Sequence, residues 1–508
     1  MATFRPASPR SRPAPVFQIA LLALVALTAV RIVGLHTSVV DLFYDEAQYW
    51  TWSQDLAFGY FSKPPLLAWI IAASELVCGS AEACVRISSP LFYLATSLVV
   101  YALANELYGR QTAFWSAIIF ALLPGVSFSA RIISTDVPLL FFWALALLAY
   151  VKLLEASDWR WATVLGVTIG LGLLAKYAMI YFLLCAACAA LIDREARALL
   201  MRRQTWVALI VALLILSPNI YWNVANEFVT LKHTGDNITG SGLRFRPLDA
   251  VSFFASQFAV AGPFVFAAFL VIFVRSLKEQ IGWEDRLMLA FSVPPLALVF
   301  ALSFFRGANP NWAAPALIAA TVLVVAWWIR TERGFWILAT FVLGLTMQAA
   351  MIAGDAYADR ITVPALGGKA DLYQRTLGWR MLGEKTAQAA RAAGAPTVAA
   401  EGRSEVAALT YYLRDEPLAV ASWPAAKSAR NQFDMTRALD DEAADPVLLV
   451  TGCPHVARLA RFYENVTRLP AVTANSGPTS ARSYYAFKLE NRRRPLEPLG
   501  PCTGAAAN

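Results

Sequence analysis

Long apolar stretches recur along most of the chain, and they constrain its fold more than any other feature. Runs of membrane-span length appear repeatedly between Val16 and Gly354, separated by short segments with charged and turn-forming residues. A helix needs about 20 apolar residues to cross the hydrocarbon core of a bilayer, and within lipid it satisfies its own backbone hydrogen bonds. The pattern therefore predicts a bundle of membrane-spanning α-helices.

Composition supports this prediction, because 58% of the 508 residues are hydrophobic and only 15% are charged. A soluble chain of this length needs more charged residues to cover its surface. Breaking the apolar stretches at charged and turn-forming residues gives about eleven spans. They lie near residues 16–35, 87–106, 112–127, 137–154, 161–175, 177–192, 205–222, 251–274, 287–304, 311–329 and 334–353.

The remaining segments predict two further features. Pro65–Cys78 is apolar but only about fourteen residues long, which suits an interfacial or re-entrant helix in the first outer loop. Residues 354–508 alternate a helical pattern with short apolar runs such as Pro446–Val450, which is typical of a small soluble α/β domain. Within it, Asn431–Asp434 is interpreted as a turn rather than a ligand contact. The predicted division is a tail (1–15), a transmembrane catalytic region (16–353) and a soluble domain (354–508).

The distribution of basic residues predicts the orientation of the bundle. The net charge of +8 is formally compatible with nucleic-acid binding, but the chain has no basic tract longer than Arg492-Arg493-Arg494. Membrane proteins concentrate Lys and Arg in their cytoplasmic loops, and a cytoplasmic N-terminus places most of the basic residues there. An odd number of spans then puts residues 354–508 outside. We expect a multi-pass protein of a bacterial inner membrane, with a periplasmic C-terminal domain and no nucleic-acid partner.

Several ionisable residues lie in the predicted outer loops, where the positive-inside rule disfavours cations. They are the acids Asp45, Glu46 and Asp136 and the bases Lys63, Arg131, Lys176 and Arg306. Cations at the outer ends of membrane helices suit a lipid-linked phosphate, and a nearby carboxylate suits deprotonation of an acceptor hydroxyl. Taken singly, each residue is more typical of a helix cap or a solvated loop than of a functional site. The prediction of a site therefore depends on their shared sidedness.

The cysteines leave two disulfides open. Cys78, Cys84, Cys453 and Cys502 all fall on the predicted outer side, where disulfides persist. The sequence leaves open whether a disulfide forms between Cys78 and Cys84, and whether one forms between Cys453 and Cys502. No cysteine has zinc-ligand spacing with a histidine, so the sequence predicts no metal ligands.

The outer-loop motifs together resemble those of a known family. The motifs are Asp45-Glu46-x-x-Tyr49, Tyr60-Phe61-Ser62-Lys63-Pro64, Thr135-Asp136-Val137-Pro138, Gly172-Leu173-Leu174-Ala175-Lys176-Tyr177 and Asn309-Pro310-Asn311-Trp312-Ala313-Ala314-Pro315. Across residues 16–330 the combination resembles the GT-C glycosyltransferases of the protein O-mannosyltransferase, aminoarabinose-transferase and galacturonic-acid-transferase kind. One departure is Gln48, where the aminoarabinose transferases have an arginine. The resemblance implies an all-α polytopic membrane fold of GT-C type, with interfacial helices in the first outer loop and an α/β domain after it.

The resemblance also implies roles for the residues that match. Asp45 matches the catalytic acid, expected to act as general base, and Glu46 and Asp136 are further catalytic candidates. Lys63 and Lys176 match ligands of the carrier phosphate. The remaining substrate-binding candidates are Tyr49, Tyr60, Asn309 and Trp312, from the motifs, and Arg131 and Arg306, which are predicted from their loops alone.

The function that the resemblance implies is inverting transfer of a sugar from an undecaprenyl-phosphate-like donor. The expected acceptor is lipopolysaccharide, at lipid A or the core, or another envelope glycan. Two alternatives remain: a protein O-glycosyltransferase with the same donor, and a flippase for a lipid-linked sugar. A flippase favours internal repeats with interrupted helices, and the sequence has no convincing repeat. No cofactor is predicted, and participation of a divalent cation is left open.

Overall fold

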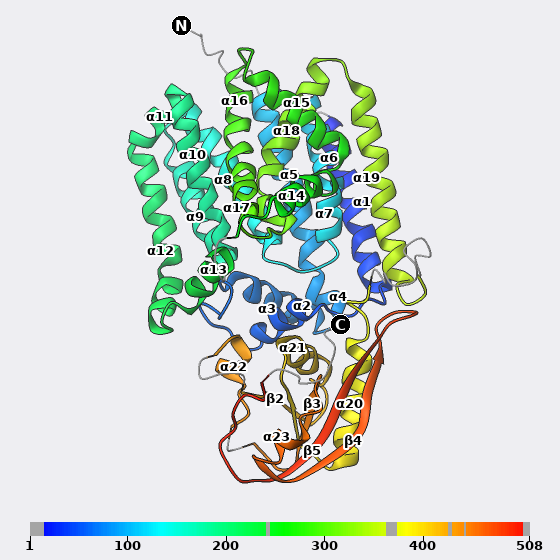
Figure 1. The fold of residues 1–508 in the computed structure, drawn as a ribbon. Helices are drawn as coiled ribbons and strands as arrows, with labels where there is room; N and C mark the ends of the chain where they lie inside the picture. Colours follow the sequence, from blue (N-terminus) through cyan, green and yellow to red (C-terminus); the bar gives the residue numbers. More distant parts are fainter. Residues whose placement is uncertain (1–14, 240–243, 362–372, 425–428, 441–442, 501–508) are drawn as a thin grey trace.

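The computed structural model describes residues 15–239, 244–361, 373–424, 429–440 and 443–500. The predicted tail, 1–15, lies almost wholly outside the described residues. The described chain consists of a large helical part followed by a smaller part that contains a sheet (Figure 1). The first half of the helical part comprises α1 (Pro15–Thr37), α2 (Tyr44–Ser53), α3 (Leu66–Cys78), α4 (Glu82–Arg86), α5 (Ser88–Tyr108), α6 (Arg110–Leu122), α7 (Pro124–Ser129), α8 (Asp136–Glu155), α9 (Trp159–Ala175), the 3-10 helix η1 (Tyr177–Ile180) and α10 (Tyr181–Ile192).

The rest of the helical part continues in the same manner. It comprises α11 (Arg194–Met201), α12 (Arg203–Ala225), α13 (Val229–Thr239), α14 (Pro247–Val260), α15 (Pro263–Ser276), α16 (Trp283–Ala290), α17 (Val293–Ser303), the 3-10 helix η2 (Pro310–Ala313), α18 (Ala316–Arg330) and α19 (Gly334–Ala356). Helices α8 and α18 are buried along most of their length, whereas α1, α12 and α19 expose many apolar side chains. The former make the core of the bundle, and the latter present an apolar surface of the kind that faces lipid.

Helix lengths bear on the predicted number of spans. In the described residues, six segments are long and apolar enough to cross a membrane: Val16–Thr37, Glu82–Tyr108, Asp136–Glu155, Arg203–Ala225, Trp283–Ser303 and Gly334–Ala356. The pair α14 and α15 makes a seventh if it counts as one span, and α3, α9, η1–α10 and α18 are shorter apolar helices. The chain is a multi-pass membrane protein, but helix length does not establish the predicted count of about eleven.

Several predicted spans are divided into shorter helices, and at two of the breaks the sequence explains the division. The stretch 112–127 is divided into α6 and α7 before Pro124, which has no N–H and forces the preceding residue into an extended conformation. The stretch 251–274 is divided into α14 and α15, which are bent by 116°. The break falls at Gly262, whose φ of 82° suits glycine, and Pro263 then starts α15.

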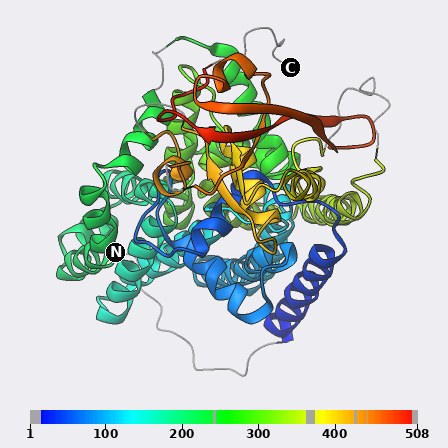
Figure 2. The ribbon, with the colours of Figure 1, turned by 90° about the horizontal axis from the view of Figure 1, so that it is seen from below.

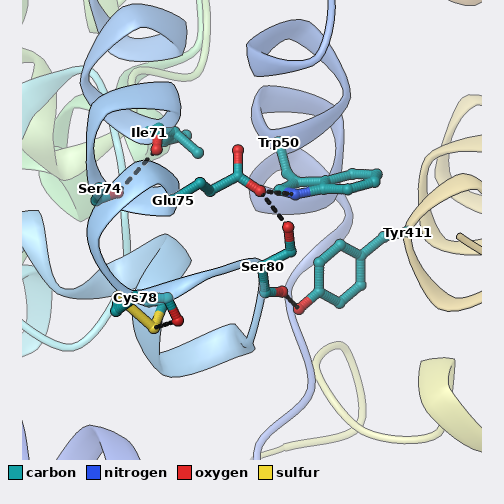
Figure 3. Close-up of a disulfide and its surroundings, with 8 residues drawn as sticks. Trp50, Ile71, Ser74, Glu75, Cys78, Ser80 and Tyr411 are labelled. Atoms are coloured by element: carbon teal, nitrogen blue, oxygen red, sulfur yellow. Dashed lines mark hydrogen bonds between the residues drawn. A yellow bond between two sulfur atoms is a disulfide. The ribbon is translucent and has the colours of Figure 1, made fainter. Parts of the chain in front are cut away.

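The segment between α1 and α5 contains the short helices α2, α3 and α4 at one end of the bundle, next to the sheet-containing part (Figure 1). Pro65–Cys78 was predicted as an interfacial helix, and α3 covers all but its first residue. Glu75 on α3 accepts hydrogen bonds from Trp50 Nε1, at 2.5 Å, and from Ser80 Oγ, at 2.6 Å (Figure 3). A disulfide joins Cys78 to Cys84 of α4. These contacts tie the three helices together. Of the second possible pair, Cys502 lies outside the described residues.

The C-terminal part is a five-stranded sheet with helices, as the alternating pattern predicted. Its elements are α20 (Trp379–Ala393), β1 (Thr397–Ala400), α21 (Arg403–Tyr412), β2 (Ala419–Ser422), α22 (Gln432–Thr436), β3 (Val447–Thr451), α23 (Val456–Leu459), β4 (Tyr463–Asn475) and β5 (Ala481–Arg492). The strand order is β2-β1-β3-β5-β4. Strands β1, β2 and β3 are parallel, with Thr397 opposite Val447, and β5 pairs antiparallel with β3 and β4. Figure 2 shows the long β4–β5 hairpin crossing the end of the bundle.

Alternation along the buried strands gives the sheet two apolar faces. Val398 on β1 and Leu448 on β3 belong to one hydrophobic cluster with α20 and α21, whereas Leu449 belongs to another, on the opposite face. Successive side chains of a strand point to opposite faces, so both faces need a cover. The first cluster also contains Trp50 of α2 and Leu67 of α3. One continuous core therefore joins the C-terminal part to the segment between α1 and α5.

Asn431, predicted to lie in a turn, caps α22. Its side-chain oxygen accepts hydrogen bonds from the backbone N–H groups of Phe433 and Asp434, at 2.8 and 3.2 Å. An asparagine at this position satisfies donors that the first helical turn leaves open. The stretch Asn431–Asp434 is therefore the capped start of a short helix.

Candidate active site

Helix α2 starts with the two adjacent carboxylates, and their side chains have different partners. Glu46 is buried, and both of its carboxylate oxygens accept from the Arg86 guanidinium, at 2.9 and 2.6 Å. It also accepts from the backbone N–H groups of Phe43, at 3.0 Å, and Ile133, at 2.9 Å. Glu46 thus closes the N-terminus of α2 and ties it to α4 and to the loop before α8. Although Glu46 is a predicted catalytic residue, the structure places it in a saturated ion pair.

Asp45 is more exposed than Glu46, and it forms an ion pair with an arginine of the C-terminal part. Arg403, the first residue of α21, places Nη1 2.8 Å from Asp45 Oδ1, and their side chains are 38% and 36% exposed. The same Nη1 donates to Gln48 Oε1 at 3.0 Å, and the guanidinium lies over the Tyr44 ring, 5.0 Å from its centroid. The Arg403 guanidinium therefore contacts both Asp45 and Gln48. Asp45 remains within reach of a substrate.

Asp136 is the centre of a second group of contacts. It is the first residue of α8, where the helix dipole favours a negative charge. Lys176, directly after α9, donates to Asp136 Oδ1 at 2.7 Å. Asn311, in η2, donates from Nδ2 to Asp136 Oδ2 at 2.6 Å. Three loops that are distant in sequence therefore meet at one carboxylate, as their predicted sidedness requires.

Lys63 lies within electrostatic range of both groups. Burial lowers the pKa of Lys63, and the charge of Lys176 lowers it further. The carboxylates of Asp136 and Asp45 act in the opposite direction, and the Arg403 guanidinium again lowers the pKa. Each of these effects requires that the charges are near neighbours. The structure thus brings together Asp45, Lys63, Asp136 and Lys176, four residues predicted from the sequence.

The loop that carries Lys63 is fixed from several sides. The Tyr60 N–H donates to the Lys63 carbonyl at 3.1 Å. Thr230 Oγ1 of α13 donates to the Tyr60 carbonyl, and the Phe61 N–H donates to Gln432 Oε1, both at 2.7 Å. These bonds run to the helical part and to the C-terminal part. The position of Lys63 therefore depends on both parts of the chain.

The predicted aromatic residues are buried beside this loop. The Tyr60 ring stacks on that of Trp52 at 4.6 Å, and its hydroxyl donates to the Trp52 carbonyl at 2.9 Å. These contacts give Tyr60 a structural role. Tyr49 is buried near Asp45 and Asp136: burial raises its pKa well above its usual value, and the charge of Asp45 raises it further. Tyr49 is therefore a neutral hydroxyphenyl group beside the acids.

The other predicted substrate ligands make different contacts. Arg131 forms an ion pair with Asp355 of α19 and lies 4.8 Å from the Phe128 ring centroid. Arg306 donates to the Asp236 carbonyl at 2.5 Å. Asn309 is the exposed residue before η2, and Trp312 packs against a small cluster around Phe253. Among the described residues, the hydrogen-bond, ion-pair and ring contacts of these four side chains do not include Asp45, Asp136 or Lys63.

Three residues that contact the site residues or carry charge effects from them were not among the sequence candidates. Asn311 lies within the motif Asn309–Pro315, so the sequence indicated its location but not its role. Arg403 comes from α21, and the sequence around it contains no motif. His233 of α13 lies 5.3 Å from the Phe61 ring, and burial together with the charges of Lys63 and Arg403 lowers its pKa. Its partner residues come from other segments, which only the fold brings together.

The site combines carboxylates with cations in the way that group transfer from a phosphate requires. A carboxylate accepts a proton, and lysine and arginine stabilise a phosphate leaving group. In the described part of the chain, no three His, Cys, Asp or Glu side chains come together as a set of metal ligands.

Comparison with known proteins identifies the family. A family model described as dolichyl-phosphate-mannose-protein mannosyltransferase matches residues 62–222. Lipid A galacturonosyltransferase RgtD from Rhizobium johnstonii is 33% identical over 464 residues, which cover 90% of this chain and 94% of that protein. The chain belongs to this GT-C glycosyltransferase family. A second member, lipopolysaccharide core galacturonosyltransferase RgtB from the same organism, is 28% identical over 59% of this chain and 63% of its own.

The fold of this glycosyltransferase agrees with its family. The crystal structure of ArnT from Cupriavidus metallidurans bound to undecaprenyl phosphate matches with a TM-score of 0.63 and 17% identity. The match covers 93% of this chain and 98% of ArnT, so it includes the bundle and the C-terminal part. The predicted GT-C type of fold is confirmed.

Proposed function

We propose that this glycosyltransferase moves a uronic-acid sugar from a polyprenyl-phosphate donor onto lipid A, at the periplasmic face of the inner membrane. The observation that carries the proposal is the convergence of Asp45, Lys63, Asp136 and Lys176 from separate loops. The relationship to a lipid A galacturonosyltransferase over nearly the whole chain supports the choice of sugar and acceptor. The two core galacturonosyltransferases match over 59% and 56% of this chain, which favours lipid A over the core.

The proposed reaction inverts the anomeric centre. The oxygen of an acceptor hydroxyl attacks the anomeric carbon on the face opposite to the phosphate, and Asp45 takes the hydroxyl proton. The bond between that carbon and the phosphate oxygen breaks, and polyprenyl phosphate leaves with the electron pair. Lys63 and Lys176 balance the charge that develops on the phosphate. Asp136 holds Lys176 in position, and Asn311 in turn donates to Asp136.

The proposed membrane orientation places the site outside. The excess of basic residues in the loops on the opposite side supports a cytoplasmic N-terminus. The disulfide between Cys78 and Cys84 lies beside α2 and supports an oxidising compartment for that end of the bundle (Figure 3). On this proposal residues 16–353 form the transmembrane catalytic region and residues 354–508 form a periplasmic domain.

Two alternatives were open from the sequence. Membership of a glycosyltransferase family decides against a flippase. Transfer to a protein hydroxyl keeps the same donor and the same site, and the description of the matching family model favours it for residues 62–222 alone. The nature of the acceptor separates it from the proposed function.

Mass spectrometry of lipid A, core oligosaccharide and envelope proteins tests the proposal. A deletion strain is compared with its parent and with strains that carry the wild-type gene or Asp45→Asn. Loss of a uronic-acid residue from lipid A, restored by the wild type but not by Asp45→Asn at equal membrane abundance, is expected. Unaltered lipid A with loss of a sugar from a protein or from the core contradicts the proposed acceptor.

A further inference from the structure

Arg403 is the cation that the C-terminal part supplies to the site, and α21 holds it firmly. Helix α21 packs on α2, and its side chains Val406 and Leu409 are fully buried in the core shared with α2. Tyr411 of the same helix contacts the Trp50 ring at 5.0 Å and donates to the Ser80 carbonyl at 2.7 Å (Figure 3). The backbone of Arg403 is thus fixed relative to Asp45.

The guanidinium itself retains spare hydrogen-bonding capacity. A guanidinium has five N–H donors in a planar fork that matches a carboxylate. The contacts with Asp45 and Gln48 both use Nη1, and the side chain is 38% exposed. Arg403 therefore has N–H donors and space for a further hydrogen-bond acceptor in addition to Asp45 and Gln48.

The charges in the site indicate which chemical group the spare N–H donors of Arg403 bind. Lys176 pairs with Asp136, and Lys63 and Lys176 are the lysines that we propose bind the donor phosphate. A uronic-acid donor brings a second negative group, the sugar carboxylate, close to the base Asp45. Two carboxylates repel each other unless a cation lies between them. Among the described residues that contact Asp45, Arg403 is the cation.

We infer that Arg403 binds the carboxylate of the donor's uronic-acid sugar and determines specificity for it. The inference rests on the proposed function, since it requires an acidic sugar. In the structure the guanidinium occupies Asp45 Oδ1. A bound sugar carboxylate competes for the same guanidinium and uncovers Oδ1 for the acceptor proton. A neutral hexose lacks this group, so it leaves the base paired.

The experiment compares two donors that differ at one group: undecaprenyl-phosphate-linked galacturonic acid and undecaprenyl-phosphate-linked galactose. The full-length protein in detergent transfers each to lipid A, and the ratio of the two kcat/KM values is the readout. Arg403→Gln is expected to lower this ratio about 10- to 100-fold, the range for a hydrogen bond between charged groups. Arg403→Lys keeps the charge but not the planar fork of donors, so its ratio is expected to lie between those of the wild type and Arg403→Gln.

Arg391→Gln is the matched control, because Arg391 of α20 pairs with Glu416 at 2.6 Å on the surface of the same part of the chain. It should leave the ratio unchanged. An equal loss with both donors in Arg403→Gln overturns the inference, since it means that Arg403 only holds Asp45. Where turnover of a variant is too slow, the ratio of the affinities for the two donors, measured by thermal shift, is a second readout and is expected to fall in the same direction.

The two proposals fail in different ways. If the wild type transfers neither sugar to lipid A, or transfers only galactose, the proposed function fails. If the wild type transfers galacturonic acid and the ratio survives in Arg403→Gln, only the inference about Arg403 fails.

Discussion

Lys176 Nζ lies 2.7 Å from Asp136 Oδ1, and both side chains are largely buried where α8 begins and α9 ends. This pair joins two loops that the sequence separates, and Asn311 adds a third. Breaking a buried ion pair from one side leaves a charge without a partner, whereas replacing both partners by neutral groups is often tolerated. The pair therefore offers a way to separate stability from catalysis.

Asp136→Ala is expected to destabilise the protein by about 3–5 kcal/mol, because it leaves Lys176 buried and unpaired. The double variant Asp136→Ala with Lys176→Met should recover most of that stability but remain inactive, since the carrier phosphate loses a ligand. Thermal unfolding in detergent and donor turnover measure the two effects. Equal stability of the single and double variants contradicts the role of the pair.

Asp45→Asn is expected to lower turnover by about 10²- to 10⁴-fold, the range for loss of a general base. The side chain is partly exposed, and an amide of the same shape keeps its place, so the melting temperature should change little. Turnover with purified donor and lipid A, together with thermal unfolding, provides the test. Near-normal turnover removes Asp45 from the role of base.

Lys63 gives the donor affinity a pH dependence. Its pKa in the folded protein is lowered by burial and by Lys176, so the ammonium loses its proton below the pH at which an ordinary lysine does. Donor affinity should fall as pH rises through this lowered pKa, because only the ammonium binds phosphate. Lys63→Arg should abolish that fall, since a guanidinium stays protonated. Donor affinity between pH 7 and 10 is the measurement, and an unchanged profile in Lys63→Arg counts against the assignment.

The same shift has a consequence for stability with a definite sign. A lysine whose pKa is lowered by folding binds fewer protons in the folded state than in the unfolded state. Stability therefore rises with pH while Lys63 loses its proton. Affinity for the donor and stability of the free protein should thus change in opposite directions over the same pH range.

Much of the fold could be predicted because a bilayer leaves few choices for an apolar chain. The positions of α1, α8 and α19 follow from apolar length alone. The sharp bend at Gly262 was missed, since both halves of 251–274 are apolar and hydropathy does not register a backbone conformation. Length also fails for α9, which is shorter than a full span.

The candidate site was predictable to the extent that its residues lie in loops near the ends of apolar helices. Asp136 and Lys176 were expected on the same side of the membrane, and the structure joins them. Arg403 was not predictable, because it lies 355 residues after Gln48 and reaches it only through the packing of α21 on α2. Glu46 was placed in the site by its neighbour Asp45, although successive helical residues point in different directions.

Glu46 and Arg86 provide a contrast to Asp45. Glu46→Ala is expected to destabilise the protein by about 3–5 kcal/mol, because it leaves the buried Arg86 guanidinium without its carboxylate. Turnover per folded molecule should remain far closer to wild type than that of Asp45→Asn. Thermal unfolding measures the loss of stability. Donor turnover is measured on the folded fraction that gel filtration isolates. A loss of turnover as large as that of Asp45→Asn in a stable protein assigns Glu46 to catalysis after all.

Replacing the disulfide between Cys78 and Cys84 tests both this covalent contact and the orientation of the protein in the membrane. Replacing both cysteines by serine should cost about 2 kcal/mol, as expected for a short closed loop. In spheroplasts, a membrane-impermeant maleimide should label fewer thiols of the serine variant than of the wild type after reduction. Before reduction the two should label alike, because the wild-type pair is oxidised. Labelling of Cys78 and Cys84 without reductant contradicts the disulfide, and protection after reduction contradicts a periplasmic location for α3 and α4.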